Sequence, residues 1–142
     1  METYVQMKNR HQREFDDLPI FFAFSNEQFK KGMEKLGLTE NDTHLIFKIN
    51  GGGFYKKTDS HLLQSYLGRT NLEMKQAISE DTSGEGFIYQ MFNYELSNYE
   101  YVVTGELEDT LDATGFTYEE IQNNPALKNG LDKAIANQNS NW

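Results

Sequence analysis

The chain has 142 residues, of which 37 % are hydrophobic, 13 % are aromatic and none is cysteine, and its formal net charge is −9. A chain of this length usually forms one domain, so we expect a single domain over residues 1–142 whose core depends on ten Phe and eight Tyr. The absence of cysteine excludes disulfides, thiolate catalysis and Cys-ligated zinc and argues against a small secreted scaffold, so we expect a cytoplasmic protein.

The first part of the chain predicts a helix, a strand and a second helix. Apolar residues recur every three to four positions over residues 3–16, which indicates an amphipathic helix that ends before Pro19. This polar start lacks the apolar run of a signal peptide. The run Ile20 to Phe24 is typical of a buried strand and is far too short to span a bilayer. The capping box Ser25-Asn26-Glu27-Gln28 then starts a helix that should end at Gly37.

Glycines indicate a hairpin in the middle of the chain. Leu45 to Ile49 and Phe54 to Lys57 are β-like segments around Asn50-Gly51-Gly52-Gly53, a turn that needs positive φ. They predict a small antiparallel sheet. Asp59 is a suitable N-cap for the long helical stretch that follows, in which Gly68 is a candidate break.

The second half of the chain predicts several short elements. Thr82-Ser83-Gly84 is an expected loop. Phe87 to Tyr99 fits both a helix and an aromatic hairpin, and we favour the helix on the spacing of its apolar residues. Tyr101 to Thr104 is expected to be one more strand, and Glu106 to Ala113 a helix that stops at Gly115.

Two further helix starts complete the predicted fold. Thr117-Tyr118-Glu119-Glu120 is a second capping box, and Pro125 begins the last helix. The polar tail Asn137 to Trp142 is expected to be frayed. The predicted fold class is α+β, with a small antiparallel sheet packed against several helices and a helix-rich C-terminal half.

The negative charge lies in the second half of the sequence. Residues 1–75 carry eleven Lys or Arg and ten Asp or Glu, whereas residues 76–142 carry two Lys and twelve Asp or Glu. No basic residue stands between Lys75 and Lys128. Such a surface repels nucleic acid and membranes and attracts basic proteins or cations. We therefore expect a basic host protein as partner, no direct nucleic-acid binding and no membrane binding, and the sequence leaves a homo-oligomer open.

No motif predicts a catalytic site, and no cofactor is expected. Gly51 to Thr58 offers the backbone amides, Lys and Thr of a phosphate loop, but such a loop needs glycine directly before its Lys-Ser/Thr pair. We favour a hairpin turn there and keep an anion site with Lys56 and Lys57 as the alternative. The adjacent residues Asp59-Ser60-His61 point in different directions, which argues against a catalytic triad. The three His residues occur singly, which argues against a transition-metal site.

The candidate partner-binding residues lie in the acidic half. The densest acidic cluster lies within residues 106–112, and it fits either a Ca²⁺ or Mg²⁺ site or, as we favour, the solvated face of a short helix. Tyrosines beside acids are typical of recognition surfaces, because Tyr offers a large contact area with little rotamer entropy. The predicted set is Glu95, Glu100, Tyr94, Tyr101, Glu106, Glu108, Asp109 and Asp112.

Three segments carry a family resemblance. They are Phe24-Ser25-Asn26-Glu27-Gln28-Phe29, Gly51-Gly52-Gly53-Phe54-Tyr55-Lys56-Lys57 and Tyr94-Glu95-Leu96-Ser97-Asn98-Tyr99-Glu100-Tyr101. Together they resemble small uncharacterised proteins carried by bacteriophages and mobile elements, over most of the chain. The resemblance implies no catalytic residue, because no established activity is associated with those proteins. Similar sequences are expected to have His at the position of Tyr99, and its absence here argues against metal binding or acid–base chemistry in that segment.

Three functions from different classes follow as hypotheses. The first is a non-enzymatic acidic protein-binding factor. In its sharper form this factor is a phage or mobile-element inhibitor whose carboxylates mimic nucleic acid on a host defence or replication protein, as in anti-restriction and anti-CRISPR inhibitors. The second is a nucleotide- or metal-binding enzyme that uses the Gly51 to Thr58 turn. The third is a structural or assembly protein, which predicts self-association that depends on concentration.

Overall fold

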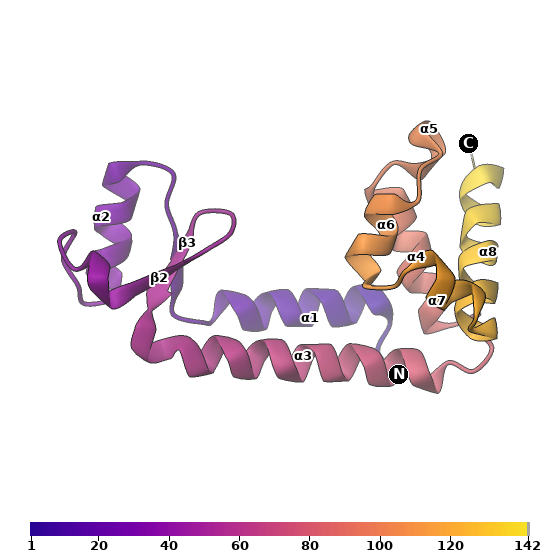
Figure 1. Ribbon diagram of the computed structural model, residues 1–142, viewed down its shortest axis with the longest axis horizontal. Coiled ribbons are helices and arrows are strands. Elements are labelled where there is room, and N and C mark those ends of the chain that lie inside the picture. Colours follow the sequence, from indigo (N-terminus) through magenta and orange to yellow (C-terminus); the bar gives the residue numbers. More distant parts are fainter. Residues whose placement is uncertain (142) are drawn as a thin grey trace. The chain divides into compact units, whose positions relative to one another are not determined.

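The computed structural model describes residues 1–141 and confirms the predicted α+β class (Figure 1). Within this range the chain forms eight α-helices and one three-stranded antiparallel sheet. The helices are α1 (Tyr4–Asp16), α2 (Asn26–Lys35), α3 (Ser60–Glu80), α4 (Phe87–Asn98), α5 (Tyr101–Thr104), α6 (Glu108–Thr114), α7 (Tyr118–Gln122) and α8 (Pro125–Ser140). The strands and 3₁₀ turns are β1 (Ile20–Phe22), η1 (Thr43–Leu45), β2 (Ile46–Ile49), β3 (Gly53–Lys56) and η2 (Lys57–Asp59).

The chain packs as two compact units. Unit 1 comprises Met1–Arg10 and the chain from Leu72 onward, and unit 2 comprises His11–Asn71. Helices α1 and α3 each begin in one unit and end in the other. The single domain expected from the chain length stays a prediction, since packing alone defines these units.

The sheet of unit 2 has the strand order β1-β3-β2, with both pairs antiparallel. The predicted hairpin is confirmed, because Gly51 and Gly52 take φ values of 90° and 87° between β2 and β3. Phe21 of β1 stands opposite Phe54 of β3, and both rings pack against Phe29 of α2, at centroid distances of 5.9 and 5.2 Å. Helix α2 therefore covers the sheet face that these two rings form.

Helix α2 begins and ends as the sequence predicts. Ser25 Oγ accepts a hydrogen bond from Gln28 N at 3.2 Å, and Gln28 Oε1 accepts one from Phe24 N at 2.8 Å. Gly37 takes a φ of 75° just past the end of the helix. The strand predicted over Ile20 to Phe24 is too long, because Phe24 takes part in this cap and is 77 % exposed.

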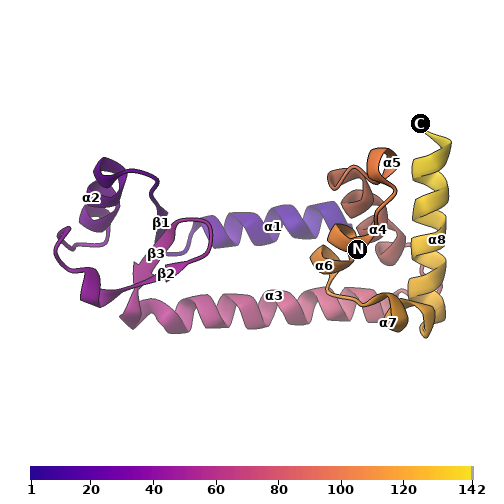
Figure 2. The same ribbon diagram turned by 45° about the horizontal axis from the view of Figure 1, so that its top comes forward.

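The core of unit 1 is built around α4. Five of its apolar side chains are at most 4 % exposed, namely Phe87, Ile88, Met91, Phe92 and Leu96. Helix α8 packs along α4, and α6 contacts α4 from another side (Figures 1 and 2). The helix favoured over residues 87–99 is thus confirmed.

A single carboxylate fastens the turn between α3 and α4. Asp81 accepts hydrogen bonds from the backbone N–H groups of Gly84, Gly86 and Ile88 at 2.9–3.1 Å. The bond from Ile88 satisfies an N–H in the first turn of α4, which has no cap from its own flanking residue. The loop predicted at Thr82-Ser83-Gly84 is confirmed, and Asp81 explains why it holds its shape.

Two glycines allow a close approach to α8. A Cβ on Gly84, which takes a φ of 80°, would lie 1.9 Å from the carbonyl oxygen of Ala126. A Cβ on Gly130 within α8 would lie 2.5 Å from Ile88 Cγ2. These contacts explain why α8 can pack tightly on α4 and on the turn before it.

Residues 101–104 are helical, so the strand predicted there is wrong. Glu100 and Gly105 take φ values of 55° and 69°, and the backbone therefore turns on both sides of one helical turn. The carbonyl groups of Glu100 and Tyr101 accept hydrogen bonds from the N–H groups of Thr104 and Gly105. The β-branched residues favour a strand locally, but the left-handed residues at both ends leave no extended segment to pair with a sheet.

The remaining predicted helices are present, with two corrections. Helix α6 stops before Gly115, whose φ is 80°, and the Thr117 capping box starts α7. Gly68 does not break α3, since one glycine costs a long helix only about 1 kcal/mol. Helix α8 continues past Asn137, so the predicted fraying is wrong for the described part of the tail, and Trp142 lies outside the described residues.

Candidate protein-binding surface

The net negative charge belongs entirely to unit 1. Unit 2 carries eight Lys or Arg and eight Asp or Glu, so its formal charge is zero. Unit 1 carries five Lys or Arg and fourteen Asp or Glu, which gives −9. The charge asymmetry along the sequence is therefore also an asymmetry between two packed units.

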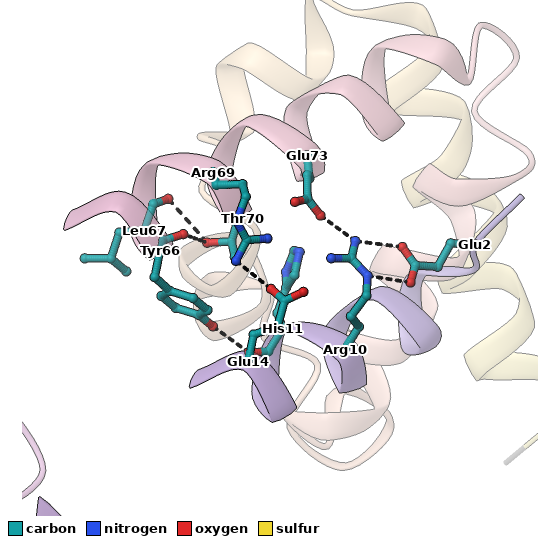
Figure 3. Close-up of polar contacts among 9 residues, drawn as sticks. All are labelled: Glu2, Arg10, His11, Glu14, Tyr66, Leu67, Arg69, Thr70 and Glu73. Atoms are coloured by element: carbon teal, nitrogen blue, oxygen red, sulfur yellow. Dashed lines mark hydrogen bonds and ion pairs between the residues drawn. The ribbon is translucent and has the colours of Figure 1, made fainter. Parts of the chain in front are cut away.

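The basic side chains of unit 1 are largely paired with acids that lie near them. Arg10 on α1 binds Glu2 at 2.9 Å and also binds Glu73 on α3 (Figure 3). Lys128 and Lys133 on α8 each hold a carboxylate within 3.3 Å. The acids that pair with these cations all lie outside residues 100–120.

The parts of α1 and α3 that belong to unit 2 are joined by polar contacts as well. Arg69 donates to Glu14 at 2.7 Å, and the hydroxyl of Tyr66 donates to the carbonyl oxygen of His11 at 2.9 Å (Figure 3). Burial is the main reason that the pKa of Tyr66 is raised, with a further contribution from the negative charge of Glu14. Arg69 and Glu14 of unit 2 are therefore also paired within their own unit.

Seven exposed acids fall between residues 100 and 120, a stretch without any basic residue that we call the acidic segment. It covers α5, α6, α7 and the turns that precede them. Within residues 1–141, none of the seven forms an ion pair. The seven acids are Glu100, Glu106, Glu108, Asp109, Asp112, Glu119 and Glu120.

Local structure accounts for some of these acids. Glu108 and Asp109 lie in the first turn of α6, and Glu119 and Glu120 lie in the first turn of α7. An acid in such a position stabilises its helix by about 0.3–1 kcal/mol through the helix dipole. Glu120 also completes the capping box of α7. In the described structure Glu100, Glu106 and Asp112 lie outside these first turns, and their side chains form no capping hydrogen bond. Helix formation therefore does not explain why they are acidic.

Exposed apolar side chains accompany the acids. Tyr99, Val103 and Tyr118 are 39 %, 70 % and 55 % exposed. Of the two tyrosines that the sequence predicts, Tyr94 is 38 % exposed, and Tyr101 is partly buried against the core. Helical spacing places Tyr99 with the apolar residues of α4, but the helix ends one residue earlier and leaves this ring accessible.

Glu95 was predicted to bind a partner, but its carboxylate is buried. Its side chain is 2 % exposed and accepts hydrogen bonds from Lys8 Nζ and from Tyr4 OH, each at 3.3 Å. The Lys8 ammonium also lies 5.0 Å from the centre of the Tyr94 ring, within cation–π distance. Burial raises the pKa of Tyr4 well above its usual value, and the charge of Glu95 raises it further. Glu95 thus ties α1 to α4 within unit 1 and does not join the exposed acids.

The sequence also offered a metal site and the Gly51 to Thr58 turn as candidates. Among residues 1–141, no three His, Asp or Glu side chains gather closely enough to hold a metal ion. Gly51 to Thr58 forms the hairpin turn, β3 and part of η2, and the Lys57 ammonium lies 5.1 Å from the centre of the Phe47 ring. Over the same range, no helix has the length and apolar character needed to cross a membrane.

Comparison with protein families decides the family of the chain. A model described as a family of unknown function, DUF7659, matches residues 3–137. The chain belongs to this family. The match agrees with the resemblance to an uncharacterised family, and DUF7659 has no described activity that could assign a role to the acidic segment. No curated protein and no solved structure matches the chain.

Proposed function

We propose that this protein is a non-enzymatic protein-binding factor whose acidic segment docks onto a basic surface of a partner protein. The observation that carries the proposal is the charge of unit 1. Its net charge is −9, and the seven exposed acids of the segment form no ion pair within residues 1–141. Exposed carboxylates that no cation of the chain neutralises are the groups that a basic partner would pair with.

The composition of the segment suits an interface. Clustered charges of one sign accelerate encounter with an oppositely charged partner and reject partners of the same sign. Tyr99, Val103 and Tyr118 supply exposed apolar area beside the carboxylates. Binding energy at interfaces comes mainly from such buried aromatic anchors, while charges at the rim set the rate and the specificity.

In its sharper form the proposal names the class of partner. Carboxylates spread over residues 100–120 would take the place of phosphates on a host nucleic-acid-binding protein, and the chain would act as an inhibitor encoded by a phage or other mobile element. Two observations support this form, namely the absence of Lys and Arg from this stretch and the resemblance carried by the three sequence segments. Capture of the partner should then compete with nucleic acid for the same surface.

The test compares two variants with equal changes in charge. The first neutralises part of the acidic segment as Glu106→Gln, Glu108→Gln, Asp109→Asn and Asp112→Asn. The matched control neutralises four exposed acids of unit 2 as Asp17→Asn, Glu27→Gln, Glu34→Gln and Glu40→Gln. Both variants keep the shape of each side chain, and surface changes of this kind alter stability little.

The wild type and both variants would be used to capture proteins from a bacterial lysate at low and at physiological salt. A captured basic protein would then be purified for affinity measurements. We expect the first variant to bind this protein about tenfold or more weakly at low salt and the control to bind like the wild type. Displacement of the wild type by a DNA or RNA oligonucleotide would support nucleic-acid mimicry. Equal affinities of the two variants, or an affinity that does not change with salt, would refute the proposal.

A further inference from the structure

One cation of unit 1 differs from the other four. Four of the five Lys or Arg residues of this unit hold a carboxylate at 3.3 Å or less. The fifth, Lys75 on α3, is exposed and forms no ion pair within residues 1–141. A unit with fourteen acids therefore leaves the ammonium group of Lys75 available.

Lys75 lines a pocket with a volume of about 410 Å³. The wall of the pocket is formed by the C-terminal part of α3, the turn before α4, the first turn of α4, Phe116 and the N-terminal end of α8, all within unit 1 (Figures 1 and 2). Binding sites for small molecules have volumes of about 300–1,000 Å³. The pocket is therefore large enough for a small ligand.

The apolar part of the pocket wall belongs to the core of unit 1. Ile88 and Leu127 are 1 % and 3 % exposed. Ile78, Phe116 and Ala126 are partly buried and pack against the same core. Covering apolar surface of this kind stabilises a complex in proportion to the area that is removed from water. This part of the wall therefore favours a ligand with an apolar body.

The carboxylate and amide oxygens of the pocket wall are already occupied. Both oxygens of Asp81 accept hydrogen bonds from backbone N–H groups of the turn before α4 and of its first residues. Asn124 Oδ1 caps α8 by accepting hydrogen bonds from the N–H groups of Ala126 and Leu127 at 3.1 and 3.2 Å. A ligand that only donates hydrogen bonds thus finds these acceptors engaged.

Two donors of the same wall remain available. Because Asn124 turns its oxygen toward α8, its NH₂ group has no partner within residues 1–141. The ammonium group of Lys75 adds three further N–H donors. Available donors next to occupied acceptors select a ligand that accepts hydrogen bonds, and the positive charge of Lys75 favours an anion.

We propose that this pocket binds a small amphipathic carboxylate, the class of ligand to which medium-chain fatty acids belong. The carboxylate group accepts hydrogen bonds from Lys75 and Asn124, and the hydrocarbon chain packs against the apolar wall formed by Ile88 and Leu127. Charge-assisted hydrogen bonds are about twice as strong as neutral ones, so the head group adds specificity to the apolar contact.

The net charge of unit 1 opposes an anionic ligand, but the lining of the pocket does not. Among the described residues that line it, Asp81 is the one acid, and backbone N–H groups stabilise its charge. At physiological salt the Debye length is about 8 Å, so exposed acids farther away are largely screened. The groups that line the pocket then decide the preference for the head group.

Three probes with the same hydrocarbon chain test this preference, namely octanoate, 1-octanol and octylammonium. Each would be titrated into the ¹⁵N-labelled protein at physiological salt and followed by amide chemical shifts in NMR spectra. We expect octanoate to shift the amides of residues 78–88 and 124–127 and to bind with a Kd at least about fivefold lower than the other two probes.

Two variants change the donors while keeping the fold. Lys75→Met removes the charge and keeps a long unbranched side chain, and it should raise the Kd for octanoate at least about fivefold and leave that for 1-octanol unchanged. Asn124→Asp keeps the acceptor that caps α8, because Asp is as good an N-cap as Asn, but replaces the donor by a negative charge. It should weaken octanoate about tenfold or more and make octylammonium the preferred probe. The controls Lys30→Met and Asn41→Asp make the same changes at exposed positions of unit 2 and should bind like the wild type.

The inference would be overturned if millimolar octanoate caused no shift of the pocket amides, or if it bound no more tightly than octylammonium. An affinity for octanoate that survives both Lys75→Met and Asn124→Asp would also overturn it. The inference does not depend on the acidic segment, because none of the four acids changed in the test of the proposed function lines the pocket. That variant should bind octanoate like the wild type, so either proposal can fail alone.

Discussion

Breaking the buried ion pair of unit 1 from its two sides should have unequal costs. Lys8→Met leaves the carboxylate of Glu95 enclosed, because that side chain is 2 % exposed. Glu95→Gln leaves an ammonium group on a side chain that is 38 % exposed and can reach water. The Gln amide also keeps an acceptor for the hydroxyl of Tyr4 and nearly the same volume.

The magnitudes follow from where each remaining group lies. Removing one partner of a buried pair costs about 3–5 kcal/mol, because the other charge stays in a medium that solvates it poorly. We expect Lys8→Met to fall in that range and Glu95→Gln to cost about 1–2 kcal/mol, the usual loss for one charge-assisted hydrogen bond to a partly solvated donor. The double variant removes both charges, so it should be more stable than Lys8→Met alone.

Urea unfolding followed by circular dichroism gives the free energies for the wild type, the two single variants and the double variant. The coupling energy from this cycle should exceed about 1 kcal/mol. The exposed pair of Lys128 and Asp132, at 2.8 Å and one helical turn apart, is the matched control and should show a much smaller coupling energy, because water screens both charges. If the two couplings are equal, or if Lys8→Met costs less than Glu95→Gln, the description of Glu95 as a buried charge held by Lys8 is wrong.

Three further predictions follow from particular contacts. Gly130→Ala should lower the midpoint of thermal unfolding, because the new Cβ would lie 2.5 Å from Ile88 Cγ2, although Ala is the better helix former. The control is Gly68→Ala in an open part of α3, which should stabilise the protein by about 0.5–1 kcal/mol. Calorimetry that finds both variants stabilised would contradict the close packing of α8 on α4. Asp81→Ala should cost about 2–3 kcal/mol in urea unfolding, because three backbone N–H groups lose their acceptor, and a loss below about 0.5 kcal/mol would show that the turn does not need this carboxylate. The pKa of Tyr4 is raised in the folded protein. The stabilising contribution of its neutral hydroxyl is therefore present below about pH 10 and is lost as the pH rises toward the folded pKa. Tyr4→Phe removes this contribution, so a series of urea unfolding curves should show that the free energy of unfolding depends less on alkaline pH.

Elements set by short-range chemistry could be predicted from the sequence. Ser25 and Thr117 start helices because their side chains satisfy N–H groups three residues ahead. Gly37 and Gly115 end helices because glycine adopts positive φ without steric cost. Each of these signals needs only neighbouring residues, so no tertiary contact can override it easily.

Residues 101–104 show where local reasoning fails. The strand preference of Val102 and Val103 is real but weak, and pairing with a sheet would have to supply the remaining stability. The deciding feature is the left-handed conformation of Glu100, which is uncommon for a non-glycine residue and is not encoded by a recognisable signal.

Glu95 shows a second kind of failure, because its charge suggests the surface although its place in the helical period indicates the core. It lies three and four residues after Phe92 and Met91, so the helical period itself places it on the buried face of α4. A charged residue at such a position needs a partner of opposite charge. The partner, Lys8, comes from a helix 87 residues away in sequence, and no short-range pattern connects the two.

The division of the charge between the units is what the proposed docking role of the acids predicts, and it argues against a role of these acids in stability. Like charges on a folded unit repel one another and lower its stability, and a unit needs a substantial core to tolerate them. Unit 1 has that core, with eleven buried side chains in one cluster, while unit 2 has a formal charge of zero and few buried side chains. Three cations of unit 1, Arg10, Lys128 and Lys133, form ion pairs with acids outside residues 100–120. An acidic docking segment requires carboxylates that have no cationic partner in the chain, because such ion pairs would have to break before a partner protein could bind. The cost is the repulsion among these carboxylates, which lowers the stability of unit 1.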